Sequence, residues 1–301
     1  MIFDKFKGLN NTFEPSKLPQ GTLTLADNIL IAKDKSVKRR LGYVQDAVGI
    51  NVTGSYATTD NKTMFVIDSG SLYSFDGNGF RSLTNGFPNA PSFWCEESTN
   101  RVFVISNGKY IQIDNDVLVT DLHSLPIPID DGVNDLGTNV EGPPTTNVLY
   151  SAYHQSSVVL AVRVGEELTR IQYSVPQVYH LFHKVNDRFE IPDTVVGMES
   201  VNGQLLIVCR HSVYVHTADS RLLKLADYGG IPGKPITKLP ENGCFFWTTR
   251  GVIKYPEFEN VSQSEVSLPP GTGAATALFE YDGDIYFLVC NDQAGQAYNA
   301  L

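Results

Sequence analysis

Three aspartates, Asp130, Asp131 and Asp135, lie close together in one short segment of the sequence. Two carboxyl groups held on opposite sides of a sugar could cleave a glycosidic bond as acid and base or nucleophile. The surrounding residues are rich in proline, glycine and asparagine, which favours an exposed loop over a rigid site. We therefore interpret these aspartates as solvated loop residues and predict no catalytic pair.

Two histidines, His180 and His183, are three residues apart and could ligate a metal ion if they lay on one face of a helix. Their neighbours are β-branched, aromatic and aliphatic, which favours a strand. The sequence also lacks a G-x-S-x-G nucleophile elbow, a C-x-x-C pair and a complete phosphate-binding loop. We expect no catalytic residue, no metal and no cofactor, and therefore a protein that is not an enzyme.

Basic residues form one cluster, at 33–40, which ends with Arg39 and Arg40. Such a run could contact nucleic acid, but it lacks interleaved aromatic residues and lies in a strand–turn–strand pattern. We assign it to surface or inter-subunit salt bridges, with a DNA contact as the alternative. The chain has 23 basic and 33 acidic residues, a net charge of −10. This balance argues against tight DNA binding, which needs clustered positive charge.

The chain around these residues repeats itself. Residues 64–77 (MFVIDSGSLYSFDG) and 102–115 (VFVISNGKYIQIDN) align without a gap at an offset of 38 residues. In each, an apolar run typical of a strand buried on both faces leads through a turn into an alternating run. Further copies occupy 205–217, 244–255 and, in part, 284–290. A period of about 40 residues is typical of a propeller blade.

We therefore predict an all-β fold: a single β-propeller domain over 1–301, with about six four-stranded blades and five or seven as alternatives. A strand from the N-terminal arm, residues 1–50, would complete the last blade and close the ring, which removes an exposed edge. A β-sandwich without ring closure is the alternative fold. The blades are expected near 52–84, 89–122, 145–190, 194–227, 234–266 and 273–301.

Two segments interrupt the period. Residues 123–147 form a long inter-blade loop insertion, and residues 179–193 enlarge the third blade. Connections of this length are usually functional, so we expect both segments to meet neighbouring subunits. The predicted subunit-contact residues are Asp130, Asp131, Asp135, His180, His183, Arg39 and Arg40.

Four cysteines are widely spaced, and three of them border apolar runs, which predicts reduced thiols in the core. Reduced thiols are consistent with assembly in a cytoplasm. No run approaches the roughly 20 apolar residues of a membrane span, and the N-terminus lacks the apolar region of a signal peptide. We expect no membrane partner. The cysteines are Cys95, Cys209, Cys244 and Cys290.

Residues 18–44 (LPQGTLTLADNILIAKDKSVKRRLGYV) contain a leucine-proline-x-glycine turn, an alanine-x-asparagine centre and an arginine-x-glycine close. This framework resembles the opening of podovirus-type tail hub or nozzle proteins of tailed phages, the packaged-DNA stabilisation or tail accessory family. Beyond this segment the similarity is one of architecture, and a chain of 301 residues lacks room for the extra tip or gate domains of larger hub proteins. The matching residues are Leu18, Pro19, Gly21, Ala26, Asn28, Arg40 and Gly42.

The resemblance implies a non-enzymatic structural protein of the virion tail, assembled in the host cytoplasm. Its copies would form a cyclic homo-oligomer, commonly a hexamer, next to the portal, the head-completion ring or another tail protein. Genomic DNA would pass through the lumen without tight binding, so that the ring helps to retain and then eject the packaged genome. One alternative is a generic protein-interaction propeller. The other is a carbohydrate-binding propeller, lectin-like or glycosidase-like, whose aromatic contacts would be Trp94, Trp247, Tyr179 and Tyr286.

Overall fold

The structure is a computed structural model of the chain. It describes residues 51–60, 62–97, 101–128, 139–239 and 243–262 together with their side chains, and also Thr276. Towards the two ends it describes strands through their backbone alone: 8–9, 22–23, 29–31, 37–39, 273–281, 284–293 and 296–300. Within these residues, no helix is long and apolar enough to cross a lipid bilayer.

The first half of the molecule folds into three sheets. The first blade consists of β5 (Val52–Ala57), β6 (Met64–Asp68), β7 (Ser71–Phe75) and β8 (Phe80–Asn85). The second consists of β9 (Ser92–Glu97), β10 (Arg101–Ser106), β11 (Lys109–Asp114) and β12 (Leu118–Asp121), followed by the short 3-10 helix η2 (Leu122–Ser124). The third contains β13 (Val140–Glu141), β14 (Val148–His154), β15 (Ser157–Gly165), β16 (Leu168–Val175), β17 (Val178–His183) and β18 (Arg188–Ile191).

Three more sheets follow. The fourth blade is β19 (Val195–Val201), β20 (Gln204–Cys209), β21 (Val213–His216) and β22 (Leu222–Ala226). The fifth is β24 (Ile236–Lys238), β25 (Cys244–Thr248), β26 (Gly251–Tyr255) and β27 (Glu259–Asn260). The sixth joins β28 (Gly273–Tyr281), β29 (Asp284–Gln293) and β30 (Gln296–Ala300) to β23 (Gly233–Lys234), which pairs with β28 in parallel.

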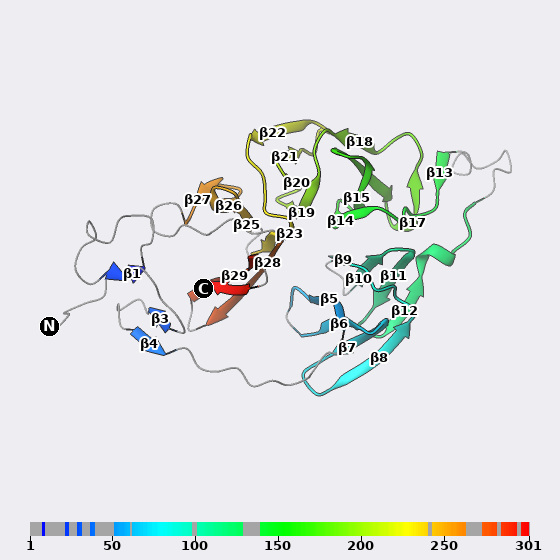
Figure 1. Cartoon of the computed structure of the whole chain (residues 1–301). Coiled ribbons are helices and arrows are strands. Elements are labelled where there is room, and N and C mark those ends of the chain that lie inside the picture. Colours follow the sequence, from blue (N-terminus) through cyan, green and yellow to red (C-terminus); the bar gives the residue numbers. More distant parts are fainter. Residues whose placement is uncertain are drawn as a thin grey trace.

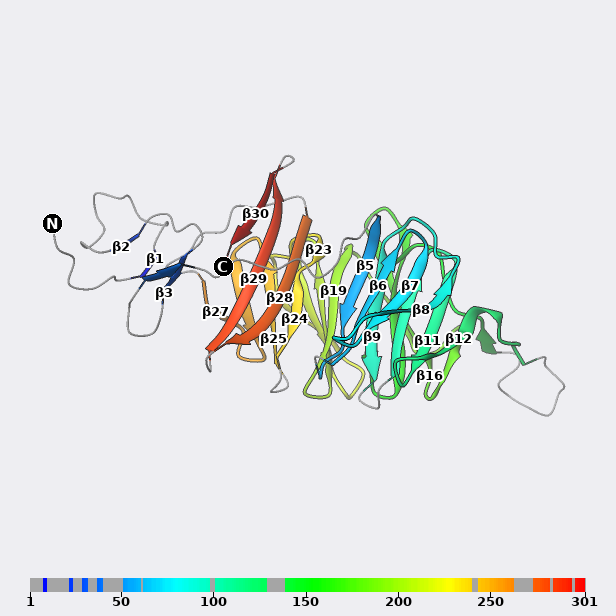
Figure 2. The same cartoon turned by 90° about the horizontal axis from the view of Figure 1, so that it is seen from below.

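The six sheets follow one another in chain order and lie side by side as propeller blades (Figures 1 and 2). Their first strands are neighbours: β5 contacts β9, β9 contacts β14, β14 contacts β19, β19 contacts β24 and β24 contacts β28. The all-β propeller predicted from the repeat is therefore confirmed, and the predicted blade ranges locate the six sheets approximately. The third sheet differs from the prediction, because it has six strands instead of four and includes β13 from before residue 145. The last sheet includes β23, which lies outside 273–301.

In the second, third and fourth blades, the second strand is buried on both faces and contributes to two separate cores. In β10, Val102 and Val104 pack against the first blade, whereas Phe103 and Ile105 pack against the third. The strands β15 and β20 divide their side chains between two neighbours in the same way. Because successive residues point to opposite faces, an uninterrupted apolar run is required at this position. This confirms the prediction of strands buried on both faces for the repeated runs in β10 and β20, whereas in β6 only alternate residues are buried and Met64 is exposed.

Three first strands share an irregularity that the sequence comparison did not reveal. The pairing register shifts between Val52 and Gly54, between Val148 and Tyr150, and between Val195 and Gly197. A β-bulge at the same place increases the local twist of each strand. At two of these places glycine also lets the next blade approach, because a Cβ would lie 1.7 Å from Ser92 Oγ at Gly54 and 2.7 Å from Ile236 Cδ1 at Gly197.

The two predicted insertions meet in the third blade. The segment 179–193 contributes β17 and β18, and both pair with β16. The short strand β13, from the end of 123–147, pairs with β17 through Val140 and His183. The long loop is therefore anchored to the enlarged blade at its C-terminal end, while residues 129–138 lie outside the described part of the chain.

Closure of the ring by an N-terminal strand stays a prediction. Among the described strands, β1 (Gly8–Leu9) pairs with β2 (Thr22–Leu23), and β3 (Ile29–Ile31) pairs with β4 (Val37–Arg39). The fourth place in the last blade is occupied instead by β23. Three cysteines, Cys95, Cys209 and Cys244, are buried free thiols, as expected, and the side chain of Cys290 lies outside the described residues.

The core between the second and third blades can be tested by Phe103→Ala. Phe103 is fully buried, with ring centroids 4.8 Å from Tyr179 and 6.3 Å from Tyr153. We expect the substitution to lower the free energy of unfolding by roughly 3–5 kcal/mol through lost burial and a cavity. Urea unfolding measures this value. The matched change Phe80→Ala, at a ring that is 46% exposed, should cost less than about 1 kcal/mol, and equal losses would contradict the described core.

Candidate functional site

Two adjacent glutamates at the end of β9 link the second blade to both of its neighbours. Glu96 accepts bonds from the first blade, and Glu97 accepts bonds from the third. The alternation of side chains along a strand sends the two carboxylates to opposite faces of the sheet. They lie at the rim where the first and second strands of the blade are joined, and other blades carry polar inter-blade contacts at the same rim. We call these contacts the inter-blade belt.

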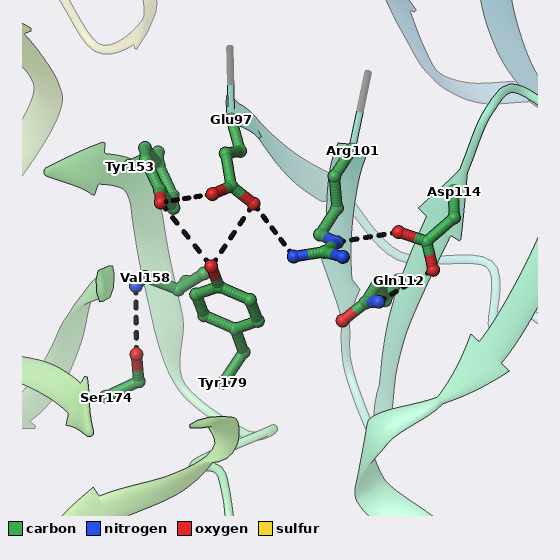
Figure 3. A network of polar contacts seen from close by, with 8 residues as sticks. All are labelled: Glu97, Arg101, Gln112, Asp114, Tyr153, Val158, Ser174 and Tyr179. Atoms are coloured by element: carbon green, nitrogen blue, oxygen red, sulfur yellow. Dashed lines mark hydrogen bonds and ion pairs between the residues drawn. The ribbon is translucent and has the colours of Figure 1, made fainter. Parts of the chain in front are cut away.

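The Glu97 contacts form the densest part of the belt (Figure 3). Tyr153 donates to Glu97 Oε1 at 2.8 Å, and Tyr179 donates to Oε2 at 3.2 Å. Arg101 Nη1 donates to the same Oε2 at 2.9 Å, while its Nε donates to Asp114 Oδ1 at 2.6 Å. Burial raises the pKa of Tyr153, and its bonds to Tyr179 and Glu97 raise it further. Tyr153 is therefore a neutral donor to a carboxylate with three partners.

On the opposite face of the sheet, Glu96 binds the first blade. Its Oε2 accepts from the Tyr56 hydroxyl at 3.0 Å, and from the backbone N and Oγ1 of Thr59, both at 2.8 Å. The pKa of Tyr56 is well above its usual value, because the ring is buried and because Glu96 carries a negative charge nearby. Both glutamates thus act as acceptors between blades.

The third and fourth blades meet through a buried histidine. His154 Nδ1 lies 2.8 Å from Ser200 Oγ, and the His154 ring lies 6.3 Å from the Tyr173 ring. The Tyr173 hydroxyl in turn forms a hydrogen bond with His216 Nδ1 at 2.9 Å. Burial, assisted by the nearby His216, lowers the pKa of His154 to about 4. His154 is therefore neutral at physiological pH.

The fourth and fifth blades complete the described belt. Tyr255 donates to Gln204 Oε1 at 2.7 Å, and Glu199 lies 3.7 Å from Lys238 Nζ. Burial raises the pKa of Glu199, while the Lys238 charge opposes this effect. In the structure the carboxylate has a cation from the next blade beside it.

The polar groups of the belt bind neighbouring blades and are not arranged to react with a substrate. A carboxyl group that acts as a general acid or base must be able to exchange a proton with a substrate, whereas Glu96 and Glu97 each accept three bonds from protein groups. Ser200 and His154 form a hydroxyl–imidazole pair of the kind that can activate a nucleophile, but this imidazole is 2% exposed and packed between blades. Within the described residues, no group of three or more His, Cys, Asp or Glu side chains could hold a metal ion.

The predicted subunit-contact residues are not brought together by the described structure. Asp130, Asp131, Asp135 and Arg40 lie outside it, and Arg39 is described through its backbone alone, as the last residue of β4. His180 is half-buried and contacts the Pro126 backbone. His183 Nε2 lies 3.3 Å from Asp187 Oδ2, an exposed carboxylate. The two histidines thus have separate partners within the chain, and their role between subunits stays a prediction.

The aromatic residues considered for sugar stacking are used inside the protein. Trp247 is 1% exposed and Tyr179 is 5% exposed. Trp94 is half-buried and stacks on Tyr56 and Phe65, with ring centroids 5.9 and 6.2 Å away. The side chain of Tyr286 lies outside the described residues. Packing thus accounts for three of the four rings.

The belt was not predicted from the sequence, although its residues form a recognisable pattern there. Glu96 and Glu97 directly follow an apolar strand and precede Arg101. Adjacent acidic residues at the end of an inner strand face both neighbouring blades, so they can be recognised once the blade boundaries are known. Their partners come from residues up to 82 positions away, as for Tyr179 and Glu97, and these pairings need the folded structure.

Comparison with known proteins supports the fold. No known family matches the sequence, and no curated protein sequence matches it. Among solved structures, streptogramin B lyase is similar with a TM-score of 0.53 and 11% identity, covering 84% of each chain. BBS1N in complex with ARL6DN is similar with a TM-score of 0.51 and 12% identity, covering 87% of this chain and 83% of that one. The neighbours are β-propeller proteins, and they include an enzyme as well as proteins that are not enzymes.

The importance of the Glu97 charge can be tested with Glu97→Gln, which keeps the size of the side chain. We expect the free energy of unfolding to fall by roughly 1.5–3 kcal/mol, because Arg101 and two tyrosines lose a charged acceptor. The control Glu190→Gln breaks an exposed ion pair with Arg170 in the third blade and should cost less than about 1 kcal/mol. Chemical denaturation of both variants measures the difference, and equal costs would mean that the Glu97 contacts contribute nothing beyond a surface pair.

The lowered pKa of His154 predicts that the protein loses stability in mild acid. Its folded-state pKa, about 4, lies below the unfolded value of about 6.5. The contribution of neutral His154 to the free energy of unfolding is therefore complete above pH 6.5 and declines as the pH falls towards 4. At pH 5 the free energy of unfolding is lower by roughly 2 kcal/mol. Urea unfolding at pH 7 and pH 5 should show this decline in the wild type and a smaller one in His154→Gln. His123→Gln, at an exposed histidine, should retain the full decline, and an identical decline in His154→Gln would rule out His154 as its source.

Proposed function

We propose that the protein is a non-enzymatic structural component of a tailed-phage virion, a ring subunit of the tail hub or nozzle. In this role its copies form a cyclic homo-oligomer, a hexamer by analogy, that borders the DNA conduit and adjoins the portal, the head-completion ring or another tail protein. The ring helps to retain the packaged genome and then to eject it.

The proposal rests on the inter-blade belt, in which polar side chains bind neighbouring blades. The carboxylates Glu96, Glu97 and Glu199 each bind or face a neighbouring blade. Bonds of this kind hold adjacent blades in one relative position. A rigid, internally fastened propeller suits a subunit that must resist the pressure of packaged DNA. The N-terminal framework of residues 18–44 supplies the resemblance to tail proteins.

The charge of the chain also supports a conduit. A net charge of −10 disfavours tight binding of phosphate, so DNA can pass without being held by counterion release. The predicted insertions at 123–147 and 179–193 supply surfaces on which neighbouring subunits could dock.

The proposal predicts a discrete cyclic oligomer. Mass photometry and native mass spectrometry of the purified chain, alone and with the adjoining tail ring, should show one closed ring, and negative-stain images should show its symmetry. A short DNA duplex should show no binding in fluorescence anisotropy at physiological salt. A monomer that persists at high concentration in the presence of the adjoining ring, or tight DNA binding, would contradict the proposal.

A further inference from the structure

A pocket lies between the second and third blades, at the rim opposite the inter-blade belt. Its volume is about 250 Å³, somewhat below the roughly 300–1,000 Å³ of sites for drug-sized ligands. It therefore suits one small ring or one side chain. The turn between β10 and β11 and the segments that precede β9 and β14 form its walls. The lining residues are Ala90, Pro91, Phe93, Ser106, Asn107, Thr145, Asn147 and Val148.

The walls of the pocket are tied to one another by hydrogen bonds. Ser106 Oγ donates to the Pro91 carbonyl at 3.2 Å, which joins the turn to the segment before β9. The Gly108 amide donates to the Thr145 carbonyl at 3.0 Å, which joins the same turn to the segment before β14. The Asn147 carbonyl accepts from the Arg163 amide at 2.9 Å. The pocket is therefore formed before a ligand arrives, and this lowers the ordering cost of binding.

Part of the pocket lining is apolar. Phe93 and Val148 belong to this part, and the Phe93 ring lies 6.2 Å from the Tyr150 ring, which supports it from the third blade. The eight lining residues include no acidic or basic side chain. A charged ligand would lose its hydration shell here and gain no opposite charge, so the pocket favours a neutral ligand.

Two asparagines, Asn107 and Asn147, belong to the lining of the pocket. Asn107 and Asn147 are exposed, and their side chains make no hydrogen bond to another described residue. Asn147 has a φ of +58°, a left-handed conformation that asparagine adopts more readily than most residues. An amide group provides both donors and an acceptor. The pocket lining therefore combines apolar side chains with residues whose amides can bind hydroxyl groups.

We propose that this pocket binds one ring of a neutral saccharide. A sugar ring has an apolar C–H face that can pack on Phe93 and hydroxyls that can both donate to and accept from the two amides. A purely apolar group would cover Asn107 and Asn147 and leave their polar atoms without partners, which costs free energy. This site is separate from the packed aromatic residues Trp94, Trp247 and Tyr179, and it does not depend on the proposed ring.

Saturation-transfer difference NMR on the full chain tests the proposal, with free glucose, galactose, mannose, rhamnose and N-acetylglucosamine as probes. We expect at least one of these sugars to receive saturation from the wild-type protein. Asn107→Ala and Asn147→Gly should each weaken its binding about tenfold, the loss expected for one hydrogen bond. Glycine at position 147 retains the left-handed backbone, so this variant should fold.

A matched control lies at the other rim. Asn115, in the turn between β11 and β12, also has a left-handed φ, +48°, and Asn115→Gly should bind the sugar as the wild type does. The proposal is overturned if no probe binds the wild type, or if the pocket variants and Asn115→Gly bind equally well. It is also overturned if N-acetylleucinamide is the probe that binds and Phe93→Ala abolishes its signal, because the pocket then holds an apolar side chain.

Discussion

Burial of the second strand on both faces is the constraint on which the rest of this molecule depends. A strand such as β10 cannot shield both rows of its side chains within its own sheet, so it needs a blade on each side. The same holds for β15 and β20. Each blade is thus a partner in two cores, and the fold is stabilised by pairs of neighbours more than by single sheets. Such repeats are stable because they are stacked.

The inter-blade belt complements these cores. Apolar packing between sheets is non-directional and would tolerate small slips of one blade against the next. Hydrogen bonds to Glu96, Glu97 and His154 have preferred lengths and angles, so they fix each blade relative to its neighbours. Their position at a rim keeps part of the network near water, which limits the desolvation cost of its charges. Burial in the cores provides most of the stabilisation, and the hydrogen bonds of the belt fix the position of each blade relative to the next.

The strand β9 connects two regions with different chemistry. It begins beside the pocket that Phe93 lines and ends at the two belt glutamates. At one end carboxylates bind the neighbouring blades, and at the other end lies the pocket, whose lining includes two asparagines with side chains that bind no other described residue. A scaffold role and a recognition role can therefore coexist on the same pair of blades. The enlarged third blade, with β13 anchored on β17, takes part in both regions.

The amino-acid sequence alone determined the class of fold and the approximate limits of most blades, but not the six strands of the third sheet or the place of β23 in the last one. These properties depend on local patterns, namely the apolar runs, the alternating runs and the turn residues that recur at residues 64–77 and 102–115. The belt and the pocket were decided by the tertiary structure, because their members come from different blades. Tyr179 reaches Glu97 across 82 positions, and the pocket combines segments before β9 and β14 with the turn after β10. Such contacts depend on how the sheets pack against one another, and no pattern within a single repeat encodes that packing by itself.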